Sequence, residues 1–391
     1  MTKTMSYPRR MPRSAKRVLA LALLSLLTAA APASARASAP VSASFFGTDA
    51  DGPLMEGALP QLGSETGVMR RAGVGALRAT VYWTTAQPYK TFADVPPDQR
   101  ASYEDVDGVP TDFKVTDEFA AQTARRGMSF LPVVYGAPRW AAKQPGAFGS
   151  PPSDDAAYGR FAAALVKRYG PGGTFWAAHP ELPAHPVRDW QIWNEPNLRP
   201  FWDDDTWAPG YVKLLRTARR AIRAADPKAR VVLAGLPNHS WTALEQLYKA
   251  GVHGLFDVAA LHPFTGQVDG VLTLVKRARK VMARGHDART PLMLTEVSWP
   301  SAAGKTSYTY GIETSERGQG RKIEAVLPML ARARRSLHIE RVYWYTWLSY
   351  DRDSVQPFDY AGVASFKDQK IKRKPGYTAL VKTVLHLEGK R

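Results

Sequence analysis

The stretch DWQIWNEPN, residues 189–197, decides the fold, because it places a carboxylate between Asn194 and Pro196 directly after an apolar run. The run VRDWQIWNE (187–195) is rich in aromatic and β-branched residues, which predicts a buried strand. A carboxylate at the end of such a strand is costly in free energy unless it is paired or hydrogen-bonded. The position of Glu195 at the end of an apolar strand therefore needs an explanation, which depends on the predicted structure of the rest of the chain.

Apolar runs of the same kind recur along the sequence and alternate with helical patterns. The other predicted strands are 44–49, 76–83, 129–136, 230–236, 257–264, 291–298 and 341–349. The predicted helices are 63–72, 117–126, 154–169, 209–225, 240–250, 268–284, 315–336 and 375–387. Regular alternation over about 350 residues favours an α/β fold in which a (β/α)8 TIM barrel forms a single domain. The alternative is a doubly wound sheet, but no glycine-rich phosphate loop follows any predicted strand.

The N-terminus has the order of segments found in a secretory signal peptide. A basic stretch precedes the apolar run VLALALLSLLTAA and the small-residue run APASARASAP. We predict a signal peptide over residues 1–37, with cleavage after Ala35 or Ala37, and a secreted, extracellular domain over residues 38–391. The pair Arg9-Arg10 weakly suggests a twin-arginine signal instead, but it lacks the usual apolar residues after it.

Charge and cysteine content narrow the classes of function. The net charge is +18, and residues 1–37 hold seven Lys or Arg and no acid, so the cleaved chain carries +11. The basic residues are dispersed along helical segments, which indicates solubility, and no nucleic-acid-binding motif is present. We expect a monomer without stable membrane insertion after cleavage. The absence of cysteine excludes disulfides and thiol chemistry.

Two carboxylates occupy equivalent positions on different strands. Glu195 ends the predicted fourth strand, and Glu296, in TEVSW (295–299), ends the seventh. In a barrel these ends share one rim, where a pair of carboxyl groups about 5–5.5 Å apart would permit retaining glycoside hydrolysis. Arg78, on the predicted second strand, could keep one of them ionised. Each glutamate taken alone could equally be a salt bridge at a strand end.

These residues resemble clan A of the glycoside hydrolases, most closely families 5 and 39 and the cellulase-like enzymes around them. The similarity rests on WNEPN with TEVSW, and extends over nearly the whole cleaved chain through PRWA (138–141), NLRPFWDDDTWAPGYVKLL (197–215) and KPGYTAL (374–380). It implies that Glu195 is the general acid/base, that Glu296 is the nucleophile, and that Asn194 hydrogen-bonds a sugar 2-hydroxyl.

The resemblance also implies roles for further residues. His262, in LHPF, matches the family histidine near the catalytic centre, although a capped loop histidine would read the same way. Phe264 stands where many members carry a tyrosine that hydrogen-bonds the nucleophile. Aromatic rings suit the apolar face of a sugar, so substrate contacts are predicted for Trp140, Trp299 and Trp347, with Trp347 as the platform under the reacting ring. Any of these three could instead be a core residue.

The sequence therefore predicts a secreted retaining glycosidase acting on β-linked oligo- or polysaccharides, without cofactor or metal. The positive charge favours an acidic or cell-surface glycan as substrate. The alternative is a catalytically inactive, secreted carbohydrate-binding barrel. A metal-dependent barrel hydrolase is disfavoured, because the eight histidines show no HxH or HExxH spacing. The acidic run 203–205 is predicted to be solvated, or to bind calcium or a sugar hydroxyl.

Overall fold

A closed cylinder of parallel strands forms the centre of the chain in the computed structural model, which describes residues 40–352 and 354–390. Its strands run in the order β7-β6-β5-β2-β1-β11-β10-β9-β8, and every neighbouring pair is parallel. Bridges from Val232 to Val258 and from Asn194 to Gly235 make β7 and β8 two halves of one strand and close the cylinder. The bounds are β1 Phe46–Asp49, β2 Ala76–Tyr82, β5 Ser129–Tyr135, β6 Asp189–Ile192, β7 Arg230–Val232, β8 Leu236–Pro237, β9 Ala259–His262, β10 Leu292–Val297 and β11 Ile339–Trp344.

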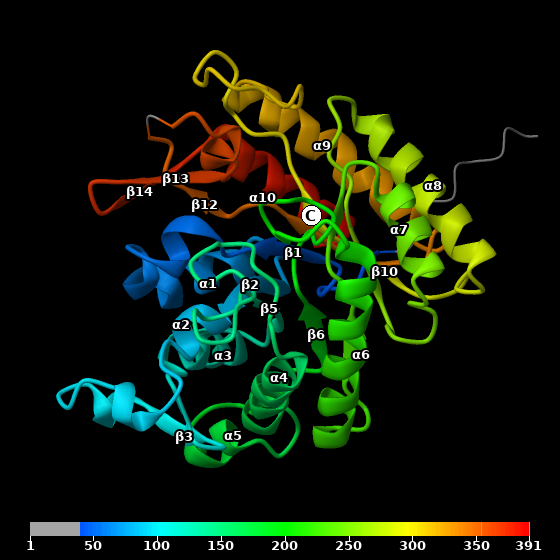
Figure 1. Ribbon diagram of the computed structural model, residues 1–391. Coiled ribbons are helices and arrows are strands. Elements are labelled where there is room, and N and C mark those ends of the chain that lie inside the picture. Colours follow the sequence, from blue (N-terminus) through cyan, green and yellow to red (C-terminus); the bar gives the residue numbers. More distant parts are fainter. Residues whose placement is uncertain (1–39, 353, 391) are drawn as a thin grey trace, which may run out of the picture. The chain divides into compact units, whose positions relative to one another are not determined.

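Helices surround these strands, which confirms the predicted (β/α)8 barrel (Figure 1). One apolar face of α4 is buried, and Asp154 caps the helix by accepting a hydrogen bond from the Ala156 backbone N–H. Among residues 40–352 and 354–390, no helix combines the length and apolar character needed to cross a bilayer. The helices are α1 Leu62–Arg71, α3 Lys114–Arg125, α4 Asp155–Tyr169, α6 Trp207–Ala225, α7 Ser240–Lys249, α8 Val268–Arg284, α9 Glu316–Ala333 and α10 Pro375–Leu387.

Some segments predicted as loops contain short elements of their own. A small antiparallel hairpin follows β2 and projects away from the barrel (cyan in Figure 1), and a three-stranded sheet follows β11. These elements are α2 Trp83–Ala86, β3 Glu104–Val106, β4 Val109–Thr111, α5 Thr174–Ala178, β12 Leu348–Ser349, β13 Ala364–Lys367 and β14 Lys370–Arg373, with 3-10 turns at Gly52–Met55, Leu59–Gln61, Phe92–Asp94, Arg100–Ser102 and Pro357–Tyr360. The predicted signal peptide lies outside the described residues.

The barrel interior is layered by polarity. At the N-terminal end of the strands, Asp189 accepts hydrogen bonds from Arg230 at 2.6 Å and Arg341 at 3.0 Å, and Arg230 also binds Glu340 through two hydrogen bonds. Above this ionic layer lies a fully buried apolar layer, made of Ala76, Leu131, Val232, Val258, Ala260, Met293 and Tyr343. The apolar layer separates this ionic layer from a second group of polar side chains at the carboxyl ends of the strands, where the barrel opens to a cavity.

Gly47 makes room for the largest side chain of the apolar layer. A Cβ atom at this position would lie 2.5 Å from Cδ1 of Tyr343 and 3.0 Å from the Ala76 carbonyl oxygen. Because the barrel centre is close-packed, no neighbour can yield without disturbing the strands.

We predict that Gly47→Ala lowers the free energy of unfolding by about 1–3 kcal/mol through overpacking. Thermal unfolding followed by circular dichroism measures this as a fall in Tm. Gly57→Ala is the matched control, because its Cβ would meet Phe366 at an ordinary contact distance of 3.5 Å. Equal Tm values for Gly47→Ala and the wild type would show that the barrel centre is looser than described.

Candidate active site

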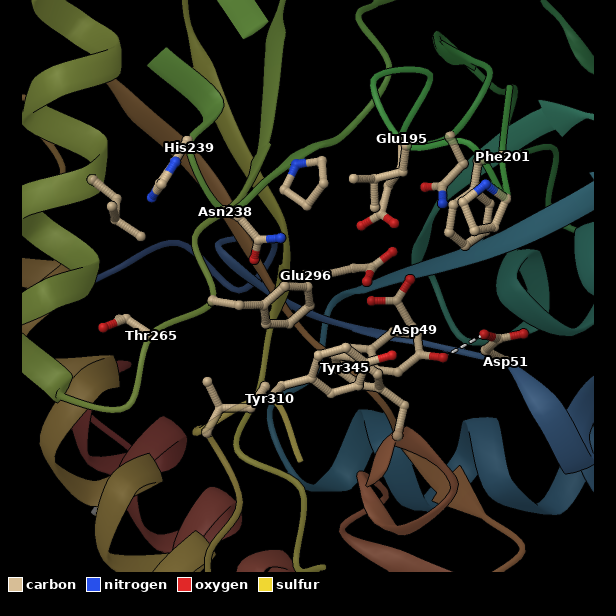
Figure 2. A pocket seen from close by; sticks show the side chains of 18 of the residues that line it. Asp49, Asp51, Glu195, Phe201, Asn238, His239, Thr265, Glu296, Tyr310 and Tyr345 are labelled. Atoms are coloured by element: carbon tan, nitrogen blue, oxygen red, sulfur yellow. Dashed lines mark hydrogen bonds between the residues drawn. The ribbon is translucent and has the colours of Figure 1, made fainter. Parts of the chain in front are cut away.

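A cavity of about 1250 Å³ opens at the carboxyl ends of the barrel strands. Each of the eight barrel strands contributes to its lining, through its own residues or those of the segment that follows it, and both Glu195 and Glu296 lie in it (Figure 2). Its volume exceeds the range of roughly 300–1,000 Å³ that is usual for small-molecule sites. The carboxyl end of a barrel is also where this fold places binding residues. The cavity is therefore the candidate active site.

A strained turn at the end of β6 directs Glu195 into the cavity. Trp193 and Glu195 have φ values of 70° and 44°, in the left-handed region that non-glycine residues rarely occupy. Each such residue costs about 1–3 kcal/mol, so the surrounding packing must hold it. Trp193 is fully buried against Tyr135 and Trp202, and its indole N–H donates to the Phe201 carbonyl at 2.7 Å. The aromatic residues around Glu195 thus hold the turn that exposes it.

Arg78 joins the polar residues of the site from its position on β2. The side chain is buried, and burial alone would lower its pKa, but the charges of Asp49 and Glu296 outweigh this and raise it. The guanidinium is therefore a permanent cation. It donates Nε to Gln191 at 2.8 Å, Nη1 to Asp49 at 2.6 Å and to Glu296 at 2.9 Å, and Nη2 to Asn194 Oδ1 at 2.9 Å.

The two glutamates lie close together in unlike environments. A carboxylate oxygen of Glu195 and one of Glu296 lie within 4.8 Å of each other. Burial raises the pKa of Glu195 to about 8, and only the more distant charge of Arg78 acts against this. Burial also raises the pKa of Glu296, but His262 and the directly bonded Arg78 both act against the rise. At neutral pH, Glu195 is therefore the protonated member of the pair.

His262 lies between the two carboxyl groups at the end of β9. Its Nδ1 is 2.6 Å from Glu195 Oε1, and its Nε2 is 3.4 Å from Glu296 Oε1. Burial lowers the pKa of the imidazole to about 3, so the ring is neutral and carries a single N–H. A protonated Glu195 donates to Nδ1, which leaves the remaining N–H on Nε2 facing Glu296. His262 thus lies between the two glutamates, near the centre of the site, where the sequence analysis had placed it.

Gly235 is a site residue that sequence reasoning missed. A Cβ atom at position 235 would lie 1.9 Å from Nε2 of His262, so only glycine leaves room for the imidazole. The same residue accepts the backbone N–H of Glu195 at 3.1 Å. A glycine inside an otherwise apolar strand run, in VVLAGL (231–236), is the signal that could have indicated a close approach.

Glu195, His262 and Glu296 could offer three ligand atoms to a metal ion. However, Glu296 Oε1 already accepts from the Arg78 guanidinium, and Glu195 is hydrogen-bonded to His262. A divalent cation bound here would lie beside a buried permanent cation and would have to displace a short hydrogen bond. The donor set therefore fits proton chemistry better than metal coordination.

The three tryptophans predicted to contact substrate lie outside the cavity lining, which corrects their assignment. Trp347 is fully buried and donates its indole N–H to Glu65 at 2.7 Å, and Trp299 is buried in the core. Trp140 donates to the Gln87 carbonyl at 2.8 Å. The resemblance had placed Trp347 in the site, but β11 ends at Trp344, and Tyr345 lines the cavity instead.

Other lining residues were not predicted as site residues. Asp49 and Asp51 follow β1, and the Tyr345 hydroxyl donates to Asp51 at 2.6 Å (Figure 2). The signal for Asp49 was the one used for Glu195, an acid at the end of an apolar strand. Phe264 also lines the cavity, and packs edge-on against His262 rather than supplying a hydroxyl.

The acidic run 203–205 is held by ion pairs within its own region. Asp203 and Asp205 both pair with Arg199, while Asp204 pairs with Lys143 and accepts a hydrogen bond from the Thr206 backbone N–H. These contacts account for the three charges without a bound calcium ion.

Comparison with solved structures places the fold among glycosidase barrels. No protein-family model matches the sequence, and no curated protein matches it. A family 39 glycoside hydrolase from Bacteroides cellulosilyticus WH2 aligns with a TM-score of 0.60 at 17% identity, over 88% of this chain and 64% of that one. The chain thus spans under two thirds of that enzyme. GH5_18 from Streptomyces cattleya, solved with GlcNAc, gives 0.62 at 14% identity, over 89% and 81%.

A hyperthermophilic β-glucosidase from Pyrococcus furiosus gives a TM-score of 0.61 at 12% identity, over 90% of this chain and 97% of that one. At these identities the comparisons bear on the fold. The predicted resemblance to clan A glycoside hydrolases is confirmed at that level, and the solved neighbours include enzymes of families 39, 53 and 5.

The raised pKa of Glu195 should appear as a pH-dependent cost to stability. The ordinary pKa of 4.5 applies to the unfolded chain, whereas the folded value is about 8. Between these values the folded state retains a proton that the unfolded state releases, so stability falls as pH rises. Glu195→Gln removes this cost, and we predict that its gain in stability over the wild type grows from pH 4 to pH 8, reaching a few kcal/mol.

Thermal unfolding of both proteins at a series of pH values checks this prediction. Glu324→Gln, at an exposed position on α9, is the control for removing a glutamate charge. A difference between Glu195→Gln and the wild type that stays constant with pH would contradict the raised pKa.

Proposed function

We propose that this protein is a secreted, retaining glycoside hydrolase that cleaves β-linked oligo- or polysaccharides. The observation that carries the proposal is the pair of buried carboxyl groups with oxygens within 4.8 Å, one bonded to Arg78 and the other with a pKa near 8. Retaining glycosidases need carboxyl groups about 5–5.5 Å apart, whereas inverting enzymes need about 6.5–9.5 Å. The geometry supports the retaining reaction.

In the first step, Glu296 attacks the anomeric carbon and Glu195 protonates the departing glycosidic oxygen. Glu296 is suited to attack because Arg78 favours its ionised form, and Glu195 is suited to donate because burial keeps its proton at neutral pH. The products of this step are a glycosyl ester on Glu296 and the free leaving group.

In the second step, the ionised Glu195 deprotonates a water molecule that attacks the same carbon from the side of the departed group. The ester bond to Glu296 breaks, and Glu195 regains its proton, so the configuration at the anomeric carbon is retained. His262 Nδ1 lies 2.6 Å from Glu195 Oε1 and accepts a hydrogen bond from Glu195 once this carboxyl group is protonated again.

Asn194 is placed to bind the sugar 2-hydroxyl. Its Oδ1 accepts from Arg78 Nη2 at 2.9 Å, which fixes the amide so that the NH2 group is left to donate to a ligand in the cavity. Such a contact strengthens when charge develops on the ring in the transition state.

Two further observations support the proposal. Solved structures with this fold are named as glycoside hydrolases and β-glucosidases, and the N-terminal leader sequence supports secretion. The alternative, an inactive carbohydrate-binding barrel, would have no use for two buried carboxyl groups side by side, one on a strained turn and one bonded to Arg78.

We predict that Glu296→Ala and Glu195→Ala each lower kcat on natural glycans by at least about 10³-fold, since each removes a group that acts in the transition state. Added azide, which can attack the anomeric carbon in place of water or of the missing carboxylate, distinguishes the acid/base from the nucleophile. With an activated aryl glycoside, Glu195→Ala should give a β-glycosyl azide and Glu296→Ala an α-glycosyl azide. NMR of the products reads the configuration, and the opposite pairing would reverse the assignment.

The pH dependence should separate the same two residues. We predict a bell-shaped profile of kcat/KM in which activity falls above about pH 8, where Glu195 loses its proton. With a dinitrophenyl glycoside, whose leaving group needs no proton, Glu195→Gln should keep the acidic limb and lose the alkaline one. An alkaline limb unchanged in Glu195→Gln would assign it to another group.

A further inference from the structure

Asp49 is a third carboxyl group at the reaction centre, with no role in the mechanism above. It ends β1, is 2% exposed, and lines the cavity beside Glu296 and Tyr345 (Figure 2). Its Oδ1 accepts from Arg78 Nη1 at 2.6 Å, but its Oδ2 is buried without a hydrogen-bond partner in the described chain. An unpartnered buried acceptor at a binding cavity is a site that a ligand donor can satisfy.

Asp51 extends the same wall of the cavity. It accepts the Tyr345 hydroxyl at 2.6 Å and the Gly52 backbone N–H at 2.9 Å, and it also lines the cavity (Figure 2). We call Asp49, Asp51 and Tyr345 the acidic wall. The wall adjoins Glu296, because a single Arg78 nitrogen donates to both Asp49 and Glu296. The wall therefore faces the sugar ring that Glu296 would attack.

The acidic wall and Glu296 bring three carboxyl groups to one side of the cavity, and a single cation is bonded to two of them. Arg78 is the one cation bonded to Asp49 and Glu296 among the described residues. The other arginines of the cavity are engaged elsewhere: Arg199 pairs with the 203–205 loop, and Arg277 stacks on Trp241 at 4.7 Å. Burial raises the pKa of Asp49, Arg78 opposes the rise, and the charge of Glu296 adds to it.

We infer that the acidic wall selects a transferred sugar ring that presents hydrogen-bond donors, either hydroxyl groups or an ammonium group, and rejects a ring that carries a carboxylate. The inference rests on the proposed glycosidase function and names its substrate class. A uronic acid would place like charges together in a site of low polarity, which is strongly unfavourable. A hydroxyl or ammonium group instead donates to Asp49 Oδ2.

The inferred rejection of a sugar carboxylate is opposite to the preference for an acidic glycan that the net charge of the whole chain, +18, suggests. Charges on the outer surface are screened by salt over roughly 8–10 Å, whereas buried groups within a few ångströms of the ligand are screened much less. The acidic wall is of the second kind, so it outweighs the basic outer surface in deciding which ring enters the reaction centre.

The test compares three 4-nitrophenyl glycosides of gluco configuration: the β-D-glucoside, which is neutral, the β-D-glucosaminide, which carries an ammonium group at C2, and the β-D-glucuronide, which carries a carboxylate at C6. We expect wild-type kcat/KM for the glucuronide to be at least about tenfold below the better of the other two. Asp49→Asn keeps the Oδ1 acceptor for Arg78. It should reduce the ratio of kcat/KM between the better glycoside and the glucuronide by about tenfold. Asp98→Asn, an exposed charge outside the cavity lining, should leave the ratio unchanged.

A preference for the glucosaminide would identify an ammonium group as the favoured donor, and a preference for the glucoside a hydroxyl. A glucuronide cleaved as fast as both other glycosides would overturn the inference while leaving the glycosidase proposal intact. Persistence of activity in Glu296→Ala would instead contradict the glycosidase mechanism.

Binding provides a readout that does not need turnover. Saturation-transfer NMR with the uncleavable methyl 1-thio-β-glucoside and methyl 1-thio-β-glucuronide should show tighter binding of the glucoside to the wild type, and a smaller difference in Asp49→Asn. Equal or tighter binding of the glucuronide to the wild type, or binding of neither sugar, would overturn the inference.

Discussion

The hydrogen bonds of one buried guanidinium organise the site. Arg78 reaches Gln191 and Asn194 on the fourth strand and its extension, Asp49 on the first, and Glu296 on the seventh. A charge buried this deeply is tolerable only when paired, so the barrel must bring its partners together. Burial raises the pKa of both glutamates, and the direct bond from Arg78 opposes that rise more closely at Glu296 than at the more distant Glu195.

Much of the fold could be predicted from periodicity, because strands buried on both faces and amphipathic helices leave clear patterns. The eight strand runs and eight helices appear at nearly the expected positions, and Glu195, Glu296, Arg78, Asn194 and His262 converge at one end of the barrel. The short elements in the loops escaped prediction, because segments of three to five residues carry too little pattern to be recognised.

The errors concern side chains whose surroundings depend on a turn after a strand or on residues far away in the sequence. Trp347 was assigned to the cavity but is buried beside Glu65, because the turn after Trp344 interrupts alternation. Gly235 and Asp49 were missed because their roles depend on neighbours far away in sequence: the imidazole of His262 and the guanidinium of Arg78. The local sequence signals at Gly235 and Asp49 do not name these distant partners. The strained turn at Trp193 and Glu195 belongs with them, since Tyr135 at the end of β5 and Trp202 after β6 pack against Trp193.

The central claim is that Glu296 forms a covalent bond with the sugar while Glu195 handles the proton. Trapping tests it most directly: incubation with activated 2-deoxy-2-fluoro β-glycosides, followed by mass spectrometry of the digested protein. The account predicts one added fluoroglycosyl mass, carried by the peptide that contains Glu296, with loss of activity as it accumulates. A label on Glu195 or on another residue, or inactivation without any covalent mass, would contradict it.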